Sequence, residues 1–238
     1  MITLAIDTSE ARGSVALLRE GRLCAGVVHS DRTDYSEWLI PAVEQVLRRA
    51  GTRMELVDLL AVATGPGSFT GVRVGLTAVK AWCEVYGKPV VGVSRLEALA
   101  RSEKRRAGAV AAFYDAQRGQ IFGGLYRSLY GRVVRIGDEL VIAPEAFLDL
   151  AGKEGSDAAV SWVSLDPEIV TGLDGWKERA ERGDTMQKSP AELAEAIAWI
   201  AEEQARAGEF TDALQLDANY VRRSDAEIFW KGPAAHAR

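Results

Sequence analysis

One glycine-rich run constrains this chain more than any other stretch: residues 61–75 read AVATGPGSFTGVRVG. A short apolar strand ends at the turn Gly65–Pro66–Gly67, and a helix begins within a few residues. Ser68 or Thr70 can cap that helix, because a side-chain oxygen there accepts hydrogen bonds from unpaired N–H groups. Such a loop suits a phosphate or another anion, since it brings backbone N–H groups to the positive end of a helix dipole. No Walker or dinucleotide motif is present, so a phosphate loop and a tight turn without a ligand remain alternatives.

The helix that follows carries small residues along one stripe. Gly71, Gly75 and Ala78 recur at helical spacing, with Val72, Val79 and Trp82 beside them. A glycine inside a helix costs about 1 kcal/mol relative to alanine. A helix that keeps Gly75 is therefore expected to have another backbone packed closely against it. That backbone can belong to this chain or to another protein.

Composition and charge narrow the class of protein. The chain has 238 residues, 47% of them hydrophobic, which suffices for one two-lobed domain or two small ones. Its formal net charge of −5 argues against tight, autonomous binding of nucleic acid. Cys24 and Cys83 are isolated, as is typical of a reducing compartment. The sequence shows neither a signal peptide nor a membrane-spanning run, so we expect a cytoplasmic protein that does not enter the membrane.

The first half alternates strands and helices. Apolar runs predict strands over 2–6, 14–18 and 23–29, joined by short turns as an antiparallel meander. A helix is expected over 36–50, apolar around much of its circumference and so buried on more than one side. A strand over 59–63 then leads into the glycine loop and a helix to about residue 86. Ser94 and Glu97 form a capping box after a strand over 89–93.

The second half repeats this pattern in outline. The first strand ends at Asp7 before a short turn, and a strand over 110–114 likewise ends at Asp115 before a turn that closes at Gly119. Strands over 133–142 and 159–164 and a helix over 144–151 follow. Ser189, Pro190 and Glu192 are suitable N-cap, first and third residues of a long helix that ends near residue 207.

The residue types needed for several kinds of chemistry are missing. The chain has only two histidines, His29 and His236, so a hydrolase triad is nearly excluded. No His/Cys/acid cluster has metal-ligand spacing, and we predict neither a catalytic residue nor a metal site. Asp7 and Asp115 could hold a metal–phosphate or orient a water. Aspartate at a strand end also bonds to the N–H groups of its own turn, and we favour that interpretation for both.

At these residues the chain resembles the TsaB (formerly YeaZ) family, the dimerisation subunits related to TsaD. The resemblance runs through most of the chain and is weaker in the second half. One departure is Tyr35, which stands where family members often carry a histidine at the start of the first helix. The matching blocks are LAIDTS at 4–9, GPGSFTGVRVG at 65–75, PVVGVSRLEALA at 89–100, DAQRGQIF at 115–122 and YVRR at 220–223.

The resemblance implies the α/β fold of actin-like ATPases and sugar kinases (the ASKHA fold), two lobes that each hold a mixed sheet with helices. We place the first lobe at residues 1–106, with a pair of helices as its interface, and the second at 107–238. The long helix over 190–207 can pack back on the first lobe.

The resemblance also implies a function in tRNA modification. TsaB-like proteins pair with the catalytic paralogue TsaD as a heterodimer, and with the ATPase TsaE. Together these move a threonylcarbamoyl group to the adenosine beside the anticodon. TsaD-like proteins hold a metal with a His-x-x-x-His pair that this chain lacks, which favours a non-catalytic subunit. On this reading tRNA is reached only through the complex, and the chain alone can form a homodimer. It has no cofactor of its own, and ATP or ADP can lie at the complex interface. The alternative is a stand-alone nucleotide hydrolase or protease of the same superfamily.

Two sets of residues are the predicted sites. The candidates for a nucleotide or phosphate loop are Asp7, Thr8, Ser9, Gly65, Gly67 and Ser68. The candidates for the partner interface are Trp38, Leu39, Val43, Gly71, Val72, Gly75, Ala78, Val79 and Trp82.

Overall fold

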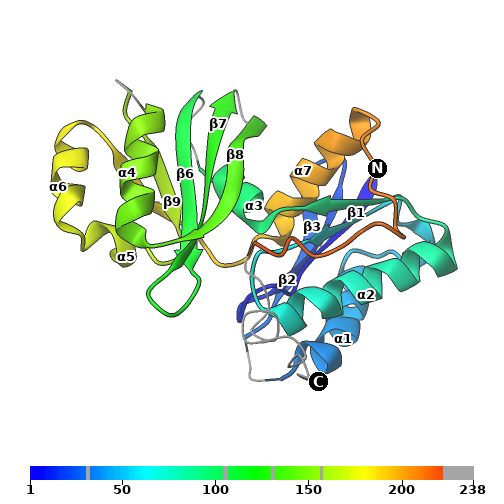
Figure 1. Cartoon of the computed structure of the whole chain (residues 1–238). Helices are drawn as coiled ribbons and strands as arrows, with labels where there is room; N and C mark the ends of the chain where they lie inside the picture. The colour runs from blue at the N-terminus through cyan, green and yellow to red at the C-terminus, as the bar shows by residue number, and fades with distance from the viewer. Residues whose placement is uncertain (31–32, 104–106, 130–131, 156–157, 222–238) are drawn as a thin grey trace, which may run out of the picture.

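The computed structural model describes residues 1–30, 33–103, 107–129, 132–155 and 158–221, and these form two five-stranded mixed sheets. Figure 1 shows the two sheets in two lobes that lie side by side. The strand order is β3-β2-β1-β4-β5 in the first lobe and β10-β9-β6-β7-β8 in the second. In both sheets a hairpin is joined to parallel strands.

Helices cover both faces of the first sheet, although its edge strand β3 is largely exposed. The predicted meander is confirmed: β1 pairs antiparallel with β2, and β2 with β3, while β4 and β5 add in parallel. Alternate side chains point to opposite faces, so Leu4 and Ile6 pack against α1 and α2, whereas Ala5 packs against α7. The bounds are β1 Ile2–Asp7, β2 Ser14–Arg19, β3 Arg22–Val28, α1 Tyr35–Arg49, the 3-10 turn η1 Met54–Leu56, β4 Leu59–Ala63, α2 Phe69–Tyr86, β5 Val90–Val93 and α7 Ala194–Arg206.

The second sheet packs against three helices on one face and against α3 on the other. Phe113, Phe147 and Trp162 form the centre of the core under α4–α6. On the opposite face α3 lies beside α7, between the lobes, so one apolar core serves both sheets. The bounds are α3 Arg95–Arg101, β6 Ala107–Asp115, β7 Ile121–Leu129, β8 Arg132–Ile142, α4 Pro144–Gly155, β9 Ser161–Ser164, α5 Glu168–Thr171, α6 Asp174–Glu181 and β10 Thr185–Lys188.

The last long helix does not begin where the sequence predicts. Helix α7 starts at Ala194, so the expected start at Ser189 and Pro190 is wrong. The hydroxyl of Ser189 instead lies 3.0 Å from that of Ser102. The first helical N–H, of Ala194, donates to Ser14 Oγ at 3.1 Å. The cap therefore comes from β2, distant in sequence, and α7 covers the first sheet although it follows the second lobe in the chain.

The end of the described chain also returns to the first lobe. Thr211 N donates to Val90 O at 2.8 Å, beside the edge strand β5, and Leu216 is buried in the first-lobe core. Asn219 N then donates to Thr64 O at 2.7 Å. Residues 215–221, which we call the C-terminal strap, thus reach the glycine loop. None of the helices in the described ranges has the length and apolar character needed to cross a membrane.

Candidate functional site: the cleft between the lobes and the α1–α2 face

The glycine loop folds onto the turn that follows β1. Ser68, one of the two predicted candidates, is the N-cap of α2, and its hydroxyl accepts from Gly71 N at 3.2 Å. Ser68 N donates to Ser9 O at 2.7 Å. A Cβ on Gly67 would lie 2.1 Å from the same Ser9 oxygen, so only glycine fits there. Close packing between two segments of this chain accounts for that glycine.

The small-residue stripe of α2 meets the same turn. A Cβ on Gly71 would lie 2.1 Å from Thr8 O, and one on Gly75 would lie 2.6 Å from Thr8 Oγ1. The Thr8 hydroxyl donates to Gly71 O at 2.7 Å. The backbone that approaches α2 is therefore the chain's own.

This packing corrects most of the predicted partner interface. Six of the nine candidates are buried inside the first lobe, and one of these, Leu39, also lines the groove between α1 and α2. Three are only partly buried: Trp38, Ala78 and Trp82. The five corrected positions are Val43, Gly71, Val72, Gly75 and Val79, and the sixth buried position is Leu39.

Asp7 is fully buried and forms an ion pair. Its carboxylate accepts from Ser9 N at 2.9 Å and from the Ser9 hydroxyl, which confirms the turn-capping interpretation. Its second oxygen accepts from Arg95 Nε at 3.0 Å, and both side chains are 0% exposed. Burial opposes the charge of Arg95, but the Asp7 carboxylate outweighs this and holds the pKa of Arg95 above its usual value. The polar groups of Asp7 and Ser9 thus serve internal contacts.

Arg95 was not predicted as a site residue, because its sequence neighbours indicate only the start of a helix. The predicted N-cap of that helix is confirmed, since Ser94 Oγ accepts from Leu96 N at 3.2 Å. The guanidinium also lies over the ring of Tyr114, at 4.8 Å, and donates to Ala191 O at 3.3 Å. These partners come from the second lobe and from the segment before α7, so no local pattern indicates them.

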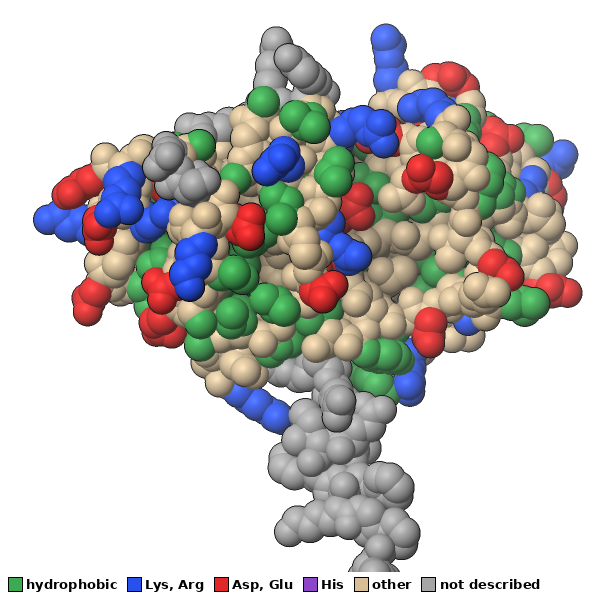
Figure 2. Space-filling view, turned by 45° about the horizontal axis from the view of Figure 1, so that its top comes forward, with side chains coloured by type: hydrophobic (Ala, Val, Ile, Leu, Met, Phe, Trp, Pro, Cys, Tyr) green, Lys and Arg blue, Asp and Glu red, His purple; other side chains and the backbone are tan. Residues whose placement is uncertain are grey.

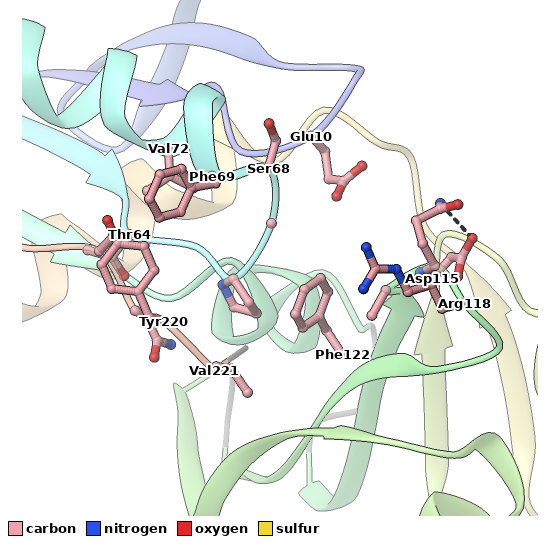
Figure 3. A pocket seen from close by; sticks show the side chains of 16 residues that line it. Glu10, Thr64, Ser68, Phe69, Val72, Asp115, Arg118, Phe122, Tyr220 and Val221 are labelled. Atoms are coloured by element: carbon pink, nitrogen blue, oxygen red, sulfur yellow. Dashed lines mark hydrogen bonds between the residues drawn. The ribbon is translucent and has the colours of Figure 1, made fainter. Parts of the chain in front are cut away.

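Asp115 closes the corresponding turn of the second lobe. Its two oxygens accept from Gln117 N at 2.7 Å and from Gln117 Nε2 at 2.8 Å, so turn-capping is confirmed here too. Gln117 and Arg118 have φ values of 63° and 60°, a left-handed conformation that is costly for residues other than glycine. The turn places Asp115 and Arg118 at the cleft between the lobes (Figure 3).

A cavity of about 580 Å³ opens between the glycine loop, the Asp115 turn and the C-terminal strap. Phe69 and Tyr220 lie at one end, Phe122 faces them, and Glu10 and Arg118 lie at the opposite end (Figure 3). Burial raises the pKa of Glu10. A second cavity, of about 790 Å³, lies beyond Asp115 and is lined by Arg12, Arg95, Asp166, Lys188 and Glu192 among others. Both cavities mix charges of the two signs.

A buried carboxylate joins the lobes beside the cleft. Glu139 of β8 accepts from Tyr126 OH at 2.5 Å, from Asn219 Nδ2 at 2.5 Å and from the Ser94 hydroxyl. Burial, and then the charge of Glu139, raise the pKa of neighbouring Glu97 to about 7. The C-terminal strap is thereby tied to both sheets. The role of Glu139 could not be predicted from the sequence, because its partners lie on three separate segments.

The described residues contain no group of three or more His, Cys, Asp or Glu side chains that could hold a metal ion. The ring nitrogens of His29 lie 2.9 Å from Ala11 O and 2.7 Å from Thr33 O, a structural role. The hydroxyl of Tyr35 accepts from Gly13 N at 2.6 Å and donates to Glu10 O. Tyr35 therefore holds the β1–β2 turn. His236, Arg222 and Arg223 lie outside the described residues.

The outer face of α1 and α2 forms a groove of about 490 Å³. Ile40 is 46% exposed and Phe69 is 42% exposed, and Val74, Thr77 and Ala78 continue the lining along α2. We call this surface the α1–α2 face. An exposed apolar surface of this kind is typical of a protein interface.

Residues 24–169 match the TsaD family, described as tRNA N6-adenosine threonylcarbamoyltransferase. The chain is 29% identical over 234 residues to "tRNA threonylcarbamoyladenosine biosynthesis protein TsaB" of Bacillus subtilis, covering 97% of this chain and 98% of the relative. The protein of the same name from Escherichia coli is 28% identical over 237 residues, 97% of each chain.

Solved structures agree with these sequence matches. YeaZ from Pseudomonas aeruginosa superposes with a TM-score of 0.71 at 27% identity, covering 92% of this chain and 99% of that one. A ROK hexokinase from Thermus thermophilus reaches a TM-score of 0.51 at 14% identity over 86% of this chain and 100% of that chain, which indicates the fold alone. The predicted two-lobed fold and the predicted resemblance are confirmed.

Proposed function

The chain belongs to the TsaD family of tRNA N6-adenosine threonylcarbamoyltransferases, and on that premise we propose that it acts in forming N6-threonylcarbamoyladenosine in tRNA, as a non-catalytic subunit that activates a separate TsaD protein. The observation that carries this proposal is the similarity to TsaB, which extends over 97% of the chain. A tRNA-modifying function also supports a place in the cytoplasm, where Cys24 and Cys83 stay reduced.

The arrangement of the cleft supports a division of labour between subunits. Asp7 is neutralised by Arg95, and Asp115 caps its own turn. The Asp7 carboxylate is thus buried and already paired, and both oxygens of Asp115 already accept hydrogen bonds within their own turn. In this proposal the TsaD subunit supplies the metal and the catalytic groups, and this chain supplies a binding surface.

The α1–α2 face is the proposed surface for TsaD. Similarity to TsaB supports this, since TsaB and TsaD are thought to pair through these two helices of each subunit. The same face can serve a homodimer when TsaD is absent. Binding of TsaE, and of ATP or ADP at the interface of the complex, completes the proposal.

We propose that tRNA is bound only by the complex. The formal net charge is −5, and Figure 2 shows acidic and basic side chains interspersed over both lobes on the face that it presents. A surface of this kind gives the phosphate backbone little to bind. A tight, salt-sensitive complex of the isolated chain with tRNA would contradict this part of the proposal.

Depletion of this protein tests the function directly. We expect N6-threonylcarbamoyladenosine to fall in tRNAs that read codons beginning with A, as measured by mass spectrometry of nucleosides. Unchanged levels would refute the proposal. Nucleotide hydrolysis by the purified chain alone would refute its non-catalytic part.

Pairing is tested by Ala78→Arg, which places a charge on the α1–α2 face. We expect affinity for TsaD to fall a hundredfold or more, because an unpaired arginine buried at a contact costs several kcal/mol. The thermal stability of the isolated chain should not change. Ala146→Arg, on the exposed side of α4, is the matched control and should bind as the unaltered chain does.

A further inference from the structure

An aromatic cluster links the cleft to the α1–α2 face. The rings of Phe69 and Tyr220 lie 5.5 Å apart. The guanidinium carbon of Arg73 lies 3.7 Å from the centre of the Phe69 ring and 5.8 Å from that of Tyr220. Arg73 Nε donates to Tyr220 OH at 2.9 Å. We call these three residues the arginine clamp.

The clamp holds an exposed arginine in one orientation. All three side chains are exposed, yet stacking and the hydrogen bond fix the guanidinium plane. An exposed arginine ordinarily loses considerable rotamer freedom when it binds a partner. These contacts restrain Arg73 before any partner arrives, and Tyr220 is itself held because it belongs to the C-terminal strap, which Asn219 ties to Thr64 and Glu139. Pre-ordered side chains of these types are typical anchors of protein interfaces.

The position of Arg73 in the groove indicates the chemistry of its ligand. Of the described residues that line the groove, Arg73 is the only charged one; the others are apolar or carry hydroxyl groups. The Nε–H of the guanidinium is bound to Tyr220, and a planar fork of N–H donors matches a carboxylate. A complementary surface is therefore apolar with one acidic side chain.

This charge pattern favours a different protein over a second copy of this chain. A second copy docked groove to groove would bring another lining in which arginine is the only charged residue, so the described lining residues would offer neither guanidinium a carboxylate. Phosphate groups of tRNA fit less well, because a single cation on an apolar surface does not follow a phosphate backbone.

We propose that Arg73, held by Phe69 and Tyr220, is the anchor that selects TsaD over a second copy of this chain, by binding a carboxylate of the TsaD subunit at the end of the α1–α2 face. This inference rests on the proposed function and adds to it the residue that determines specificity. Tyr220 acts through Arg73 and is a positioning residue.

The test measures affinity for the TsaD subunit by calorimetry. Arg73→Gln removes the charge and should weaken binding at least tenfold, while Arg73→Lys should recover only part of that loss, because an ammonium cannot make two parallel bonds. Arg48→Gln, an exposed position on α1 outside the groove, is the control and should change affinity less than twofold. Raising the salt concentration should reduce the difference in TsaD affinity between Arg73→Gln and the unaltered chain, because salt screens the interaction between charges.

A double-mutant cycle separates positioning from general stability. Tyr220→Phe keeps the ring and removes the hydroxyl, so affinity should fall a few-fold in the unaltered background. In the Arg73→Gln background the same change should have no effect, since its partner is already absent. Thermal unfolding of each variant checks that the fold is intact.

Three results would overturn the inference. Equal TsaD binding by Arg73→Gln and the unaltered chain refutes the anchor and leaves the proposed function standing. No binding by the unaltered chain refutes the pairing and the anchor together. A loss confined to tRNA binding or to self-association would assign the guanidinium to a phosphate or to a second copy.

Discussion

Replacing Gly71 by alanine tests whether the small-residue stripe faces the chain's own turn. A stripe that faced a partner would leave room for a methyl group in the isolated chain. The change would then be neutral or stabilising, because alanine exceeds glycine in helix propensity by about 1 kcal/mol. The structure predicts the opposite sign.

The size of the effect follows from the geometry around Thr8. A Cβ at position 71 would lie 2.1 Å from Thr8 O, an atom of the backbone that cannot rotate away. Ordinary contact would require the helix and the turn to separate by roughly 1 Å, and overpacking of this kind costs about 1–3 kcal/mol. Separation would also stretch the bond from Thr8 Oγ1 to Gly71 O, worth about 1 kcal/mol. The gain in helix propensity offsets part of these costs, so we expect the free energy of unfolding to fall by about 2 kcal/mol in total.

Thermal and urea unfolding of the isolated chain measure this loss. A loss of about 2 kcal/mol corresponds to a fall in Tm of about 4–8 °C for a domain of this size. Gly75→Ala should cost less, since its Cβ would meet the Thr8 hydroxyl, at 2.6 Å, rather than backbone. Ala81→Gly, at an exposed position of α2, calibrates the propensity term. A Gly71→Ala variant at least as stable as the unaltered chain would refute the reasoning.

Two further predictions concern buried charges. Asp7→Asn leaves the guanidinium of Arg95, which is 0% exposed, without its carboxylate. The free energy of unfolding in urea should fall by about 3–5 kcal/mol, and adding Arg95→Met should recover part of this loss. An Asp7→Asn variant as stable as the unaltered chain would contradict the role of the pair. The pKa of Glu97 is raised to about 7 from the usual 4.5, so the folded state binds this proton more tightly and the group's contribution to stability falls as pH rises between these values. The Glu97→Gln variant should therefore have the same free energy of unfolding as the unaltered chain near pH 4 and a higher one at pH 8, by roughly 3 kcal/mol at most. A difference in stability that does not vary with pH would contradict this prediction.

The parts of the fold that depend on neighbouring residues could be predicted from the sequence. Short apolar runs joined by turn residues predicted the meander, because a strand and the turns that bound it are neighbours in the sequence. Ser94 was predicted as an N-cap, Ser68 as one of two candidates for another, and Asp7 and Asp115 as turn caps. Each bonds to N–H groups a few residues away.

The arrangement of the candidate site was decided by tertiary structure. The sequence predicted that a backbone approaches the helix at Gly75 and left its owner open. The structure places the Thr8 side chain at Gly75 and the Thr8 backbone at Gly71, both from this chain, so the expected backbone at Gly75 and its assignment to a partner were wrong. Helix α7 was expected to begin at its own Ser189, but Ser14 provides its cap across 180 residues. A hydrogen bond is recognisable locally only when donor and acceptor are fixed by the same few backbone angles.

Contacts between residues far apart in the sequence cannot be recognised from a local pattern. Arg95 meets Asp7 across 88 residues, and Arg73 meets Tyr220 across 147. Neither arginine differs in its local pattern from one that is fully solvated. For Arg95, the packing of two sheets around one shared core removes the side chain from water, so its charge must be paired. For Arg73, which stays exposed, the return of the C-terminal strap to the first lobe places Tyr220 beside it.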